Sequence, residues 1–197
     1  MRDRFAAIYT AVFADILDAR GHHDQTLPPA IRPLEPGTRV AGPAYTMKGG
    51  PATNADSASY DTAIRKVLAM LGAVPEGCVA LYACDHDVSA HIGELSVTSP
   101  SSATRASRSS PASSRPRIRP GAGELEATQV PVTIGRARIE PGDWIVGDDD
   151  GVVVVPHAIA EDVLTDAAQK AATESEIRVA SSGGMPPLEA YEPYGTF

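Results

Sequence analysis

The feature that most constrains the fold is the stretch Pro141 to Pro156, which reads Pro-Gly-Asp-Trp-Ile-Val-Gly-Asp-Asp-Asp-Gly-Val-Val-Val-Val-Pro. Trp144 to Val146 and Val152 to Val155 are strand-forming, and the glycine-bounded acidic segment Gly147 to Gly151 between them predicts a turn. A valine run without polar alternation is typical of a strand that is covered on both faces. We therefore predict a hairpin that lies inside the core rather than at an edge of the sheet.

The turn of this hairpin contains three consecutive aspartates, Asp148, Asp149 and Asp150. Calcium-binding loops alternate their ligands with other residues, and consecutive carboxylates do not easily converge on one ion. We therefore favour a solvated turn over a metal site at this position.

The composition bounds the function classes. A chain of 197 residues can form one sizeable core, and its net charge of -8 argues against a surface dedicated to nucleic acid, which needs clustered Lys and Arg. A small anionic ligand in a locally positive pocket remains compatible with this charge. No apolar run of membrane-spanning length and no signal-peptide pattern occurs, so we expect a cytoplasmic protein without a membrane partner. Cys78 and Cys84 are expected to be reduced and buried.

The order of predicted elements indicates an α/β fold. Apolar residues at helical spacing predict a first helix over Arg4 to Ala19 that Gly21 ends, and a proline-rich loop follows over 22–37. A strand is expected over Thr38 to Met47, with a bend or bulge at Gly42-Pro43, and a second helix ends at Gly72. The next strand is expected over Cys78 to Cys84. A helix between two strands predicts a crossover unit, although a mixed sheet is equally allowed. The remaining predicted elements are a strand over Gln129 to Ile134, a strand over Ala137 to Ile139, and a last helix from His157 to Val179 that packs on a neighbouring helix or subunit.

Polar side chains follow the strand that ends at Cys84, in the position where ligands gather in α/β folds. A metal site would use His91 and Glu94 with Asp85 or Asp87, and His86 lies in the same segment. The alternative, which we favour, is a solvated loop followed by the start of a helix.

The segment Val97 to Gly123 differs from the rest of the chain. It contains eight serines, five arginines and four prolines but no acidic residue, so it offers little apolar surface for burial. We expect an irregular or disordered segment. The alternative is a basic arm for RNA, formed by Arg105, Arg108, Arg115, Arg117 and Arg119. The segment has no aromatic side chains on which bases could stack, which makes this alternative less favourable.

Four segments, taken in order, resemble the RraA-like family, which contains regulators of ribonuclease activity and 4-hydroxy-4-methyl-2-oxoglutarate aldolases. They are Ala14 to Asp18, Gly37 to Thr46, His91 to Leu95 and Pro141 to Pro156. The resemblance covers most of the chain apart from Ser96 to the region of Pro120. It implies a β/β/α fold of the swivelling-domain type, a single domain over residues 1–197, and a homotrimer or hexamer with the active site between subunits.

The resemblance also implies a metal-dependent carbon–carbon lyase. The aldolases of the family cleave 4-hydroxy-4-methyl-2-oxoglutarate into two pyruvates and commonly decarboxylate oxaloacetate. A divalent cation, here expected to be Mg²⁺, and an arginine hold the 2-oxo acid and stabilise its enolate. In the family, backbone amides of a Gly-Glu turn bind the pyruvyl carboxylate, and the matching residues here are Gly93, Glu94, Leu95 and Ser96.

This chain departs from the family where an Arg-Asp pair is expected. The arginine position falls on Arg115, which the resemblance marks as the catalytic and substrate-binding arginine, and the aspartate position falls on Pro116. Proline has no carboxylate, so the metal ligand is unknown. The abrupt change of composition is what a frameshifted or partly deleted coding segment would produce, and translation of the other reading frames tests this hypothesis. The open alternative to a lyase is a non-catalytic binding module, either a regulator that binds a ribonuclease or an inactive member of the family.

Overall fold

The computed structural model of the protein describes residues 1–33, 35–50, 57–84, 106–108 and 124–182, together with 186 and 189. Its helices and strands follow in the order α1 (Arg2–Ala6), α2 (Thr10–Ala19), β1 (Ile31–Pro33), β2 (Val40–Gly50), α3 (Ser57–Ala73), β3 (Val79–Cys84), β4 (Ala106–Arg108), β5 (Glu124–Thr128), β6 (Val132–Ile134), β7 (Ala137–Ile139), β8 (Trp144–Asp148), β9 (Gly151–Val155), the 3-10 helix η2 (His157–Ile159) and α4 (Ala160–Ser182). The fold is therefore mixed α/β, as predicted.

The long strand β2 organises the main sheet, which has the order β3-β2-β8-β9 with β5 also paired to β2. Its first part, Val40 to Pro43, pairs antiparallel with β8, and from Ala44 onward it pairs parallel with β3. The strand partner therefore changes after Pro43, at the position of the predicted bend. The bulge lies instead at Lys48/Gly49, where β2 pairs with β5. β2 also extends to Gly50, beyond its predicted end at Met47.

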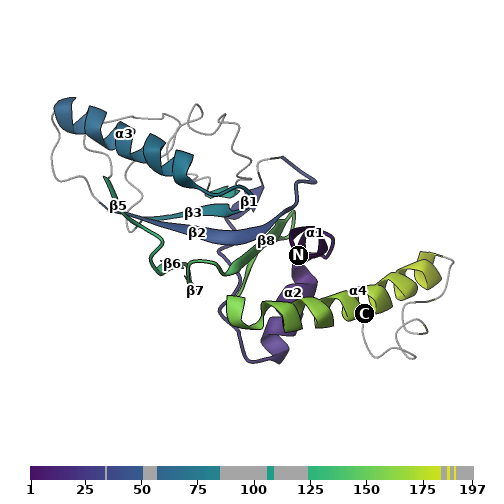
Figure 1. The fold of residues 1–197 in the computed structure, drawn as a ribbon. Helices are drawn as coiled ribbons and strands as arrows, with labels where there is room; N and C mark the ends of the chain where they lie inside the picture. The colour runs from purple at the N-terminus through teal and green to yellow at the C-terminus, as the bar shows by residue number, and fades with distance from the viewer. Residues whose placement is uncertain are drawn as a thin grey trace.

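The helix α3 connects β2 to the parallel strand β3, which confirms the predicted crossover unit within a mixed sheet. It lies over the face of β2 and β3, as Figure 1 shows. Met70 and Val74 pack there against Tyr45 and Met47 of β2. The helix ends at Ala73, one residue beyond the predicted terminator Gly72, which therefore lies inside its last turn.

The predicted hairpin is present as β8 and β9, which pair antiparallel from Trp144↔Val155 to Asp148↔Gly151. Every residue of the two strands except Gly151 is buried. The prediction that the hairpin avoids the edge was wrong for β9, which is the last strand in the order. Its outer edge is covered because Leu27 donates to the carbonyl of Val152 and Val154 donates to that of Gln25. Burial of both faces therefore does not require a strand on each side.

The predicted first helix is in fact two helices, α1 and α2, separated at Tyr9, whose backbone is extended. Two tertiary contacts stabilise the break. The carboxylate of Asp148 accepts hydrogen bonds from the backbone N–H and the hydroxyl of Thr10, at 2.9 and 2.6 Å, and so caps the start of α2. Arg39 donates to the carbonyls of Ala6 and Ala7 at the end of α1.

These contacts also correct the description of the acidic turn. Asp148 is only 6% exposed and belongs to β8, so it is not part of a solvated turn. Asp149 and Asp150 are exposed as predicted, and the carboxylate of Asp149 accepts a hydrogen bond from the backbone N–H of Gly37.

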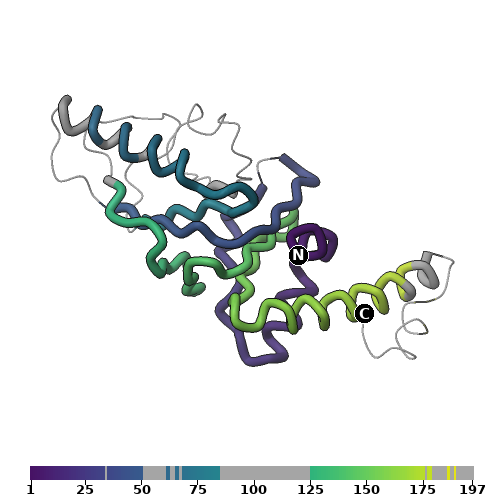
Figure 2. Tube along the Cα trace, viewed as in Figure 1, coloured from purple at the N-terminus to yellow at the C-terminus, as the bar shows by residue number. Residues whose placement is uncertain are grey.

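The last helix, α4, packs along α2 below the hairpin end of the sheet (Figure 2). Val163, Leu164 and Ala167 are fully buried there with Phe13 and Leu17 of α2. Packing on a neighbouring helix was one of the two predicted arrangements for this stripe. The ion pair between Arg20 and Asp166, at 2.6 Å, joins the two helices at the surface.

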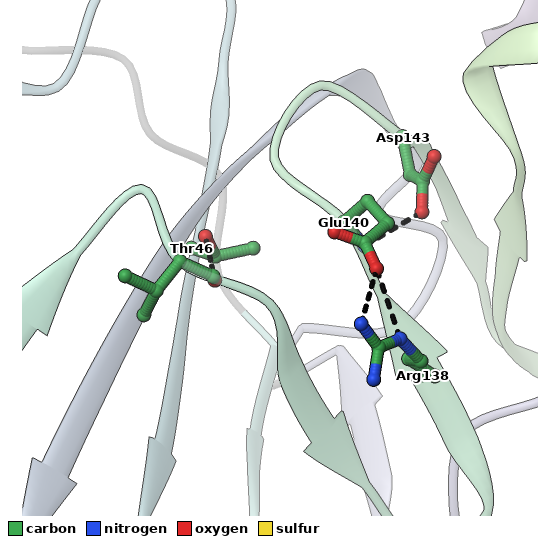
Figure 3. Close-up of polar contacts among 5 residues, drawn as sticks. Thr46, Arg138, Glu140 and Asp143 are labelled. Carbon is green, nitrogen blue, oxygen red and sulfur yellow. Dashed lines mark hydrogen bonds and ion pairs between the residues drawn. The ribbon is translucent and has the colours of Figure 1, made fainter.

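The strand β5 was not predicted from the sequence. β5 pairs with β2. The predicted strand over 129–134 begins only at Val132, and Gln129 has a positive φ of 55°. The hydroxyl of buried Thr46 donates to the carbonyl of Val130 at 2.7 Å and fixes this corner (Figure 3). Asp143 accepts from the backbone N–H groups of Glu140 and His157, so it joins β7 to the entry of the last helix.

β4 lies within the segment that was predicted to be irregular, and it pairs antiparallel with β1. The rest of 97–123 lies outside the described residues, so the prediction for it stays a prediction.

Candidate functional site

The candidate site lies where β2 and β3 end side by side. The two strands are parallel, and their carboxyl ends, at Gly50 and Cys84, lie at the same edge of the sheet. In α/β folds, ligands bind in the crevice just beyond the carboxyl ends of such strands. β5 runs antiparallel along the other side of β2 and brings a third set of side chains to this edge.

An ion pair occupies this end of the sheet. The ammonium of Lys48 lies 3.1 Å from Oε2 of Glu126, and the two side chains are 45% and 44% exposed. Glu126 reaches this position through the bulge, because Lys48 pairs with Ala127 and Gly49 pairs with Leu125, which leaves Glu126 without a register partner. Both charged groups are therefore accessible to a small ligand from solution.

Two successive glycines allow polar side chains to approach the backbone of β2 closely. A Cβ atom on Gly49 would lie 1.9 Å from the hydroxyl oxygen of Tyr82, and one on Gly50 would lie 1.9 Å from Oε1 of Glu126. Successive residues of a strand face opposite sides, so the phenol and the carboxylate lie against opposite faces of the sheet. Glycine inside a strand commonly marks such a close approach.

The environment of Tyr82 keeps its phenol protonated. Burial, together with smaller contributions from the neighbouring Cys84 and Glu126, raises the pKa of Tyr82 to about 12. The hydroxyl is consequently a neutral hydrogen-bonding group at neutral pH. Burial also raises the pKa of the Cys78 thiol. Cys78 and Cys84 are half-buried, so the prediction that both are buried was wrong.

The residues that the resemblance marked for catalysis and substrate binding lie outside the described residues. This applies to Gly93, Glu94, Leu95, Ser96, Arg115 and Pro116, and equally to the polar cluster Asp85, His86, Asp87, His91 and Glu94. Their roles stay predictions. The strand β3, which precedes these residues in the chain, ends at Cys84 at the same end of the sheet as Lys48.

Sequence reasoning missed Lys48, Tyr82 and Glu126. One usable signal was present: Lys48-Gly49-Gly50 directly follows a strand-forming run, although the predicted strand ended at Met47. Glu126 carried no comparable signal, because its position depends on an unpredicted strand.

A divalent metal has no assigned ligands in this structure. Within the ranges that the structure describes, no group of three or more His, Cys, Asp or Glu side chains is arranged to hold a metal ion. The described residues therefore assign no metal ligand, and we derive no step through a metal.

A separate groove lies at the opposite part of the molecule, between α2, α4 and the β8–β9 turn. It has a volume of about 630 Å³. Arg39 and Arg178 stack over the half-exposed ring of Tyr9 at its rim, at 4.2 and 5.5 Å from the centroid. It is lined by Tyr9, Ala11, Val12, Asp15, Asp150, Glu174, Ile177 and Arg178.

Comparison with known proteins agrees with the predicted resemblance. The sequence profile described as "RraA-like: Aldolase/RraA" matches residues 100–154, a range that includes part of the Ser/Arg/Pro segment which we had placed outside the resemblance. A protein of Burkholderia multivorans named "Putative 4-hydroxy-4-methyl-2-oxoglutarate aldolase" is 33% identical over 173 residues, which cover 74% of this chain and 96% of the relative. A protein of the same name from Halalkalibacterium halodurans is 42% identical over 62 residues, which cover 32% of this chain and only 30% of that relative.

Solved structures have the same fold. An uncharacterized protein from Pseudomonas syringae pv. tomato aligns with a TM-score of 0.74 and 26% identity, over 98% of this chain and 92% of that one. RraAS2 of Streptomyces coelicolor, described as an unusual member of the RNase ES inhibitor RraA protein family, aligns with a TM-score of 0.64 and 21% identity, over 90% and 96% of the two chains.

The sheet topology and these neighbours define a mixed α/β protein with the RraA-like fold. The chain belongs to the RraA-like family. Among the helices in the described ranges, none is long and apolar enough to cross a membrane.

Proposed function

We propose that this protein is a carbon–carbon lyase that acts on a small 2-oxo acid, of the 4-hydroxy-4-methyl-2-oxoglutarate aldolase and oxaloacetate decarboxylase type. The observation that carries the proposal is the 33% identity to the Burkholderia multivorans relative, which extends over 96% of that relative. A divalent cation, Mg²⁺, is part of the proposal because the family resemblance implies it.

The candidate site supports a substrate that carries carboxylates. Lys48 supplies a positive charge at the carboxyl end of β2, although the whole chain has a net charge of -8. Glu126 neutralises this charge in the structure, so a substrate carboxylate has to take the place of Glu126 to pair with Lys48.

Pyruvate release tests the proposal. Purified protein with magnesium chloride is mixed with oxaloacetate or with 4-hydroxy-4-methyl-2-oxoglutarate, and pyruvate is followed with lactate dehydrogenase and NADH. We expect saturable turnover above the spontaneous decarboxylation measured without protein. Rates equal to that background on both substrates would reject the proposal.

The second candidate is a non-catalytic binding module, and Pro116 at the expected aspartate position favours it. It predicts no turnover together with retention of a ribonuclease on the immobilised protein. A version with an Arg-Asp pair at 115–116 separates the two candidates, since restored turnover by Pro116→Asp would identify a damaged lyase site.

A further inference from the structure

Glu126 places a carboxylate group in a position that a ligand carboxylate could occupy. Its Oε2 contacts the ammonium of Lys48 at 3.1 Å, and its Oε1 lies 1.9 Å from where a Cβ atom on Gly50 would be. The carboxylate thus pairs with one ammonium and occupies space that the missing side chain of Gly50 leaves open. Both features are independent of which molecule carries the carboxylate.

We infer that Lys48 binds a carboxylate of the substrate against Gly50, and that Glu126 fills this place when substrate is absent. The inference rests on the proposed function and adds to it a substrate-binding residue and an internal competitor. The location supports it, because the pair lies at the carboxyl end of two parallel strands, where ligands of α/β folds bind.

Exchange of one carboxylate for another is physically easy at this position. Nearly half of each side chain is exposed, and ion pairs with such exposure contribute little to folding stability. Glu126 is also the residue displaced from the strand register by the bulge, so its side chain can move away without loss of a strand pairing. A substrate carboxylate that replaces it preserves the charge contact of Lys48.

The two partners therefore have opposite expected effects. Lys48→Met removes the charge but keeps most of the length of the side chain, and we expect the KM for oxaloacetate to rise about tenfold or more, as for loss of a charge-assisted hydrogen bond, with a smaller change in kcat. Glu126→Gln removes the competing charge at nearly constant volume, and we expect the KM to fall. A merely structural ion pair would change KM in the same direction in both variants.

The matched control is the pair formed by Arg138 and Glu140, which is also exposed and has a 2.9 Å contact between Nη2 and Oε1 (Figure 3). Arg138→Met and Glu140→Gln should leave the KM within twofold of wild type. Circular dichroism and thermal unfolding of all four variants confirm that each is folded before its kinetics are compared.

Binding of malonate, measured by calorimetry in magnesium-containing buffer, separates this inference from the proposed function. The carboxylate site is supported if Lys48→Met weakens the binding of malonate and Glu126→Gln strengthens it. This holds even if wild type shows no turnover, because the lack of turnover rejects only the lyase. If Lys48→Met changes neither the KM nor the affinity for malonate, the inference is overturned. Turnover by wild type would still uphold the lyase in that case. A weaker affinity in Glu126→Gln overturns the role of Glu126 as a competitor, and absence of malonate binding to wild type overturns the site.

Discussion

The carboxylate of Asp148 accepts hydrogen bonds from both the backbone N–H and the hydroxyl of Thr10, although 138 positions separate the two residues in the chain. The same carboxylate accepts from the N–H of Asp150 and so also shapes the β8–β9 turn. One buried side chain consequently connects the central hairpin to the start of α2. Thr10 is itself 2% exposed, so water does not compete for these bonds.

Replacement of this carboxylate should destabilise the protein. We expect Asp148→Asn to lower the free energy of unfolding by about 1–3 kcal/mol, because buried donors lose a charged acceptor. Urea unfolding followed by circular dichroism measures the change. The exposed neighbour Asp150 provides the control, since Asp150→Asn should stay within about 0.5 kcal/mol of wild type. Equal losses in both variants would contradict the capping role of Asp148.

The close approach of β2 to the turn before β3, at Gly42, gives a second prediction. A Cβ there would lie 2.3 Å from the carbonyl oxygen of Gly77, and backbone atoms cannot move aside easily. We expect Gly42→Ala to lower the free energy of unfolding by about 1–3 kcal/mol, as for other overpacked positions. Thermal unfolding is the measurement.

Gly72 is the matched control for Gly42. It lies in the last turn of α3 with no atom within 4 Å of an added Cβ. Gly72→Ala should therefore leave the stability unchanged or raise it by up to about 1 kcal/mol through helix propensity. A stabilising effect of Gly42→Ala would show that the strand contact is looser than described.

The phenol of Tyr82 predicts a stability change at high pH. Its pKa is raised from 10.0 to about 12 in the folded protein, so above pH 10 the unfolded chain loses this proton before the folded protein does. The unfolded state then binds fewer protons, and stability should fall as the pH rises from 10 toward 12. Urea unfolding at several pH values should show a shallower fall for Tyr82→Phe than for wild type. Identical slopes in the two proteins would contradict the shift.

Phe5 should contribute strongly to the core. It is fully buried, its ring lies 4.5 Å from that of Trp144 and 5.3 Å from that of Phe13, and it joins α1 to β8 and α2. We expect Phe5→Ala to cost about 3–5 kcal/mol and Phe5→Leu clearly less. Trp144 is the only tryptophan, so its fluorescence reports the loss of this contact directly. An unchanged emission maximum in Phe5→Ala would contradict the stacking.

Elements encoded by neighbouring residues were predictable. The hairpin Trp144 to Val155, the crossover from β2 through α3 to β3, and the last helix all follow from periodicity and turn residues within short windows. Their boundaries were less accurate, as the extension of β2 to Gly50 shows. The residues that the resemblance assigned to the site, including Arg115 and the turn Gly93 to Ser96, stay predictions because they lie outside the described residues.

Features that depend on distant partners were not predictable from local pattern. The periodicity of the first helix continues through Tyr9, and only the hydrogen bonds from Thr10 to Asp148 and from Arg39 to the end of α1 show why the helix is interrupted. Lys48 and Glu126 likewise meet because β2 and β5 pair at one end of the sheet.

The sequence by itself determined which segments of this protein become strands and helices, and through its motifs it indicated the RraA-like family. Only the tertiary structure decided where the first helix breaks, which aspartate is buried, and which charged groups meet at the end of β2. The physical reason is that propensity and hydrophobic pattern act between neighbours in the chain, whereas capping, ion pairing and close backbone approach act between residues that folding alone brings together.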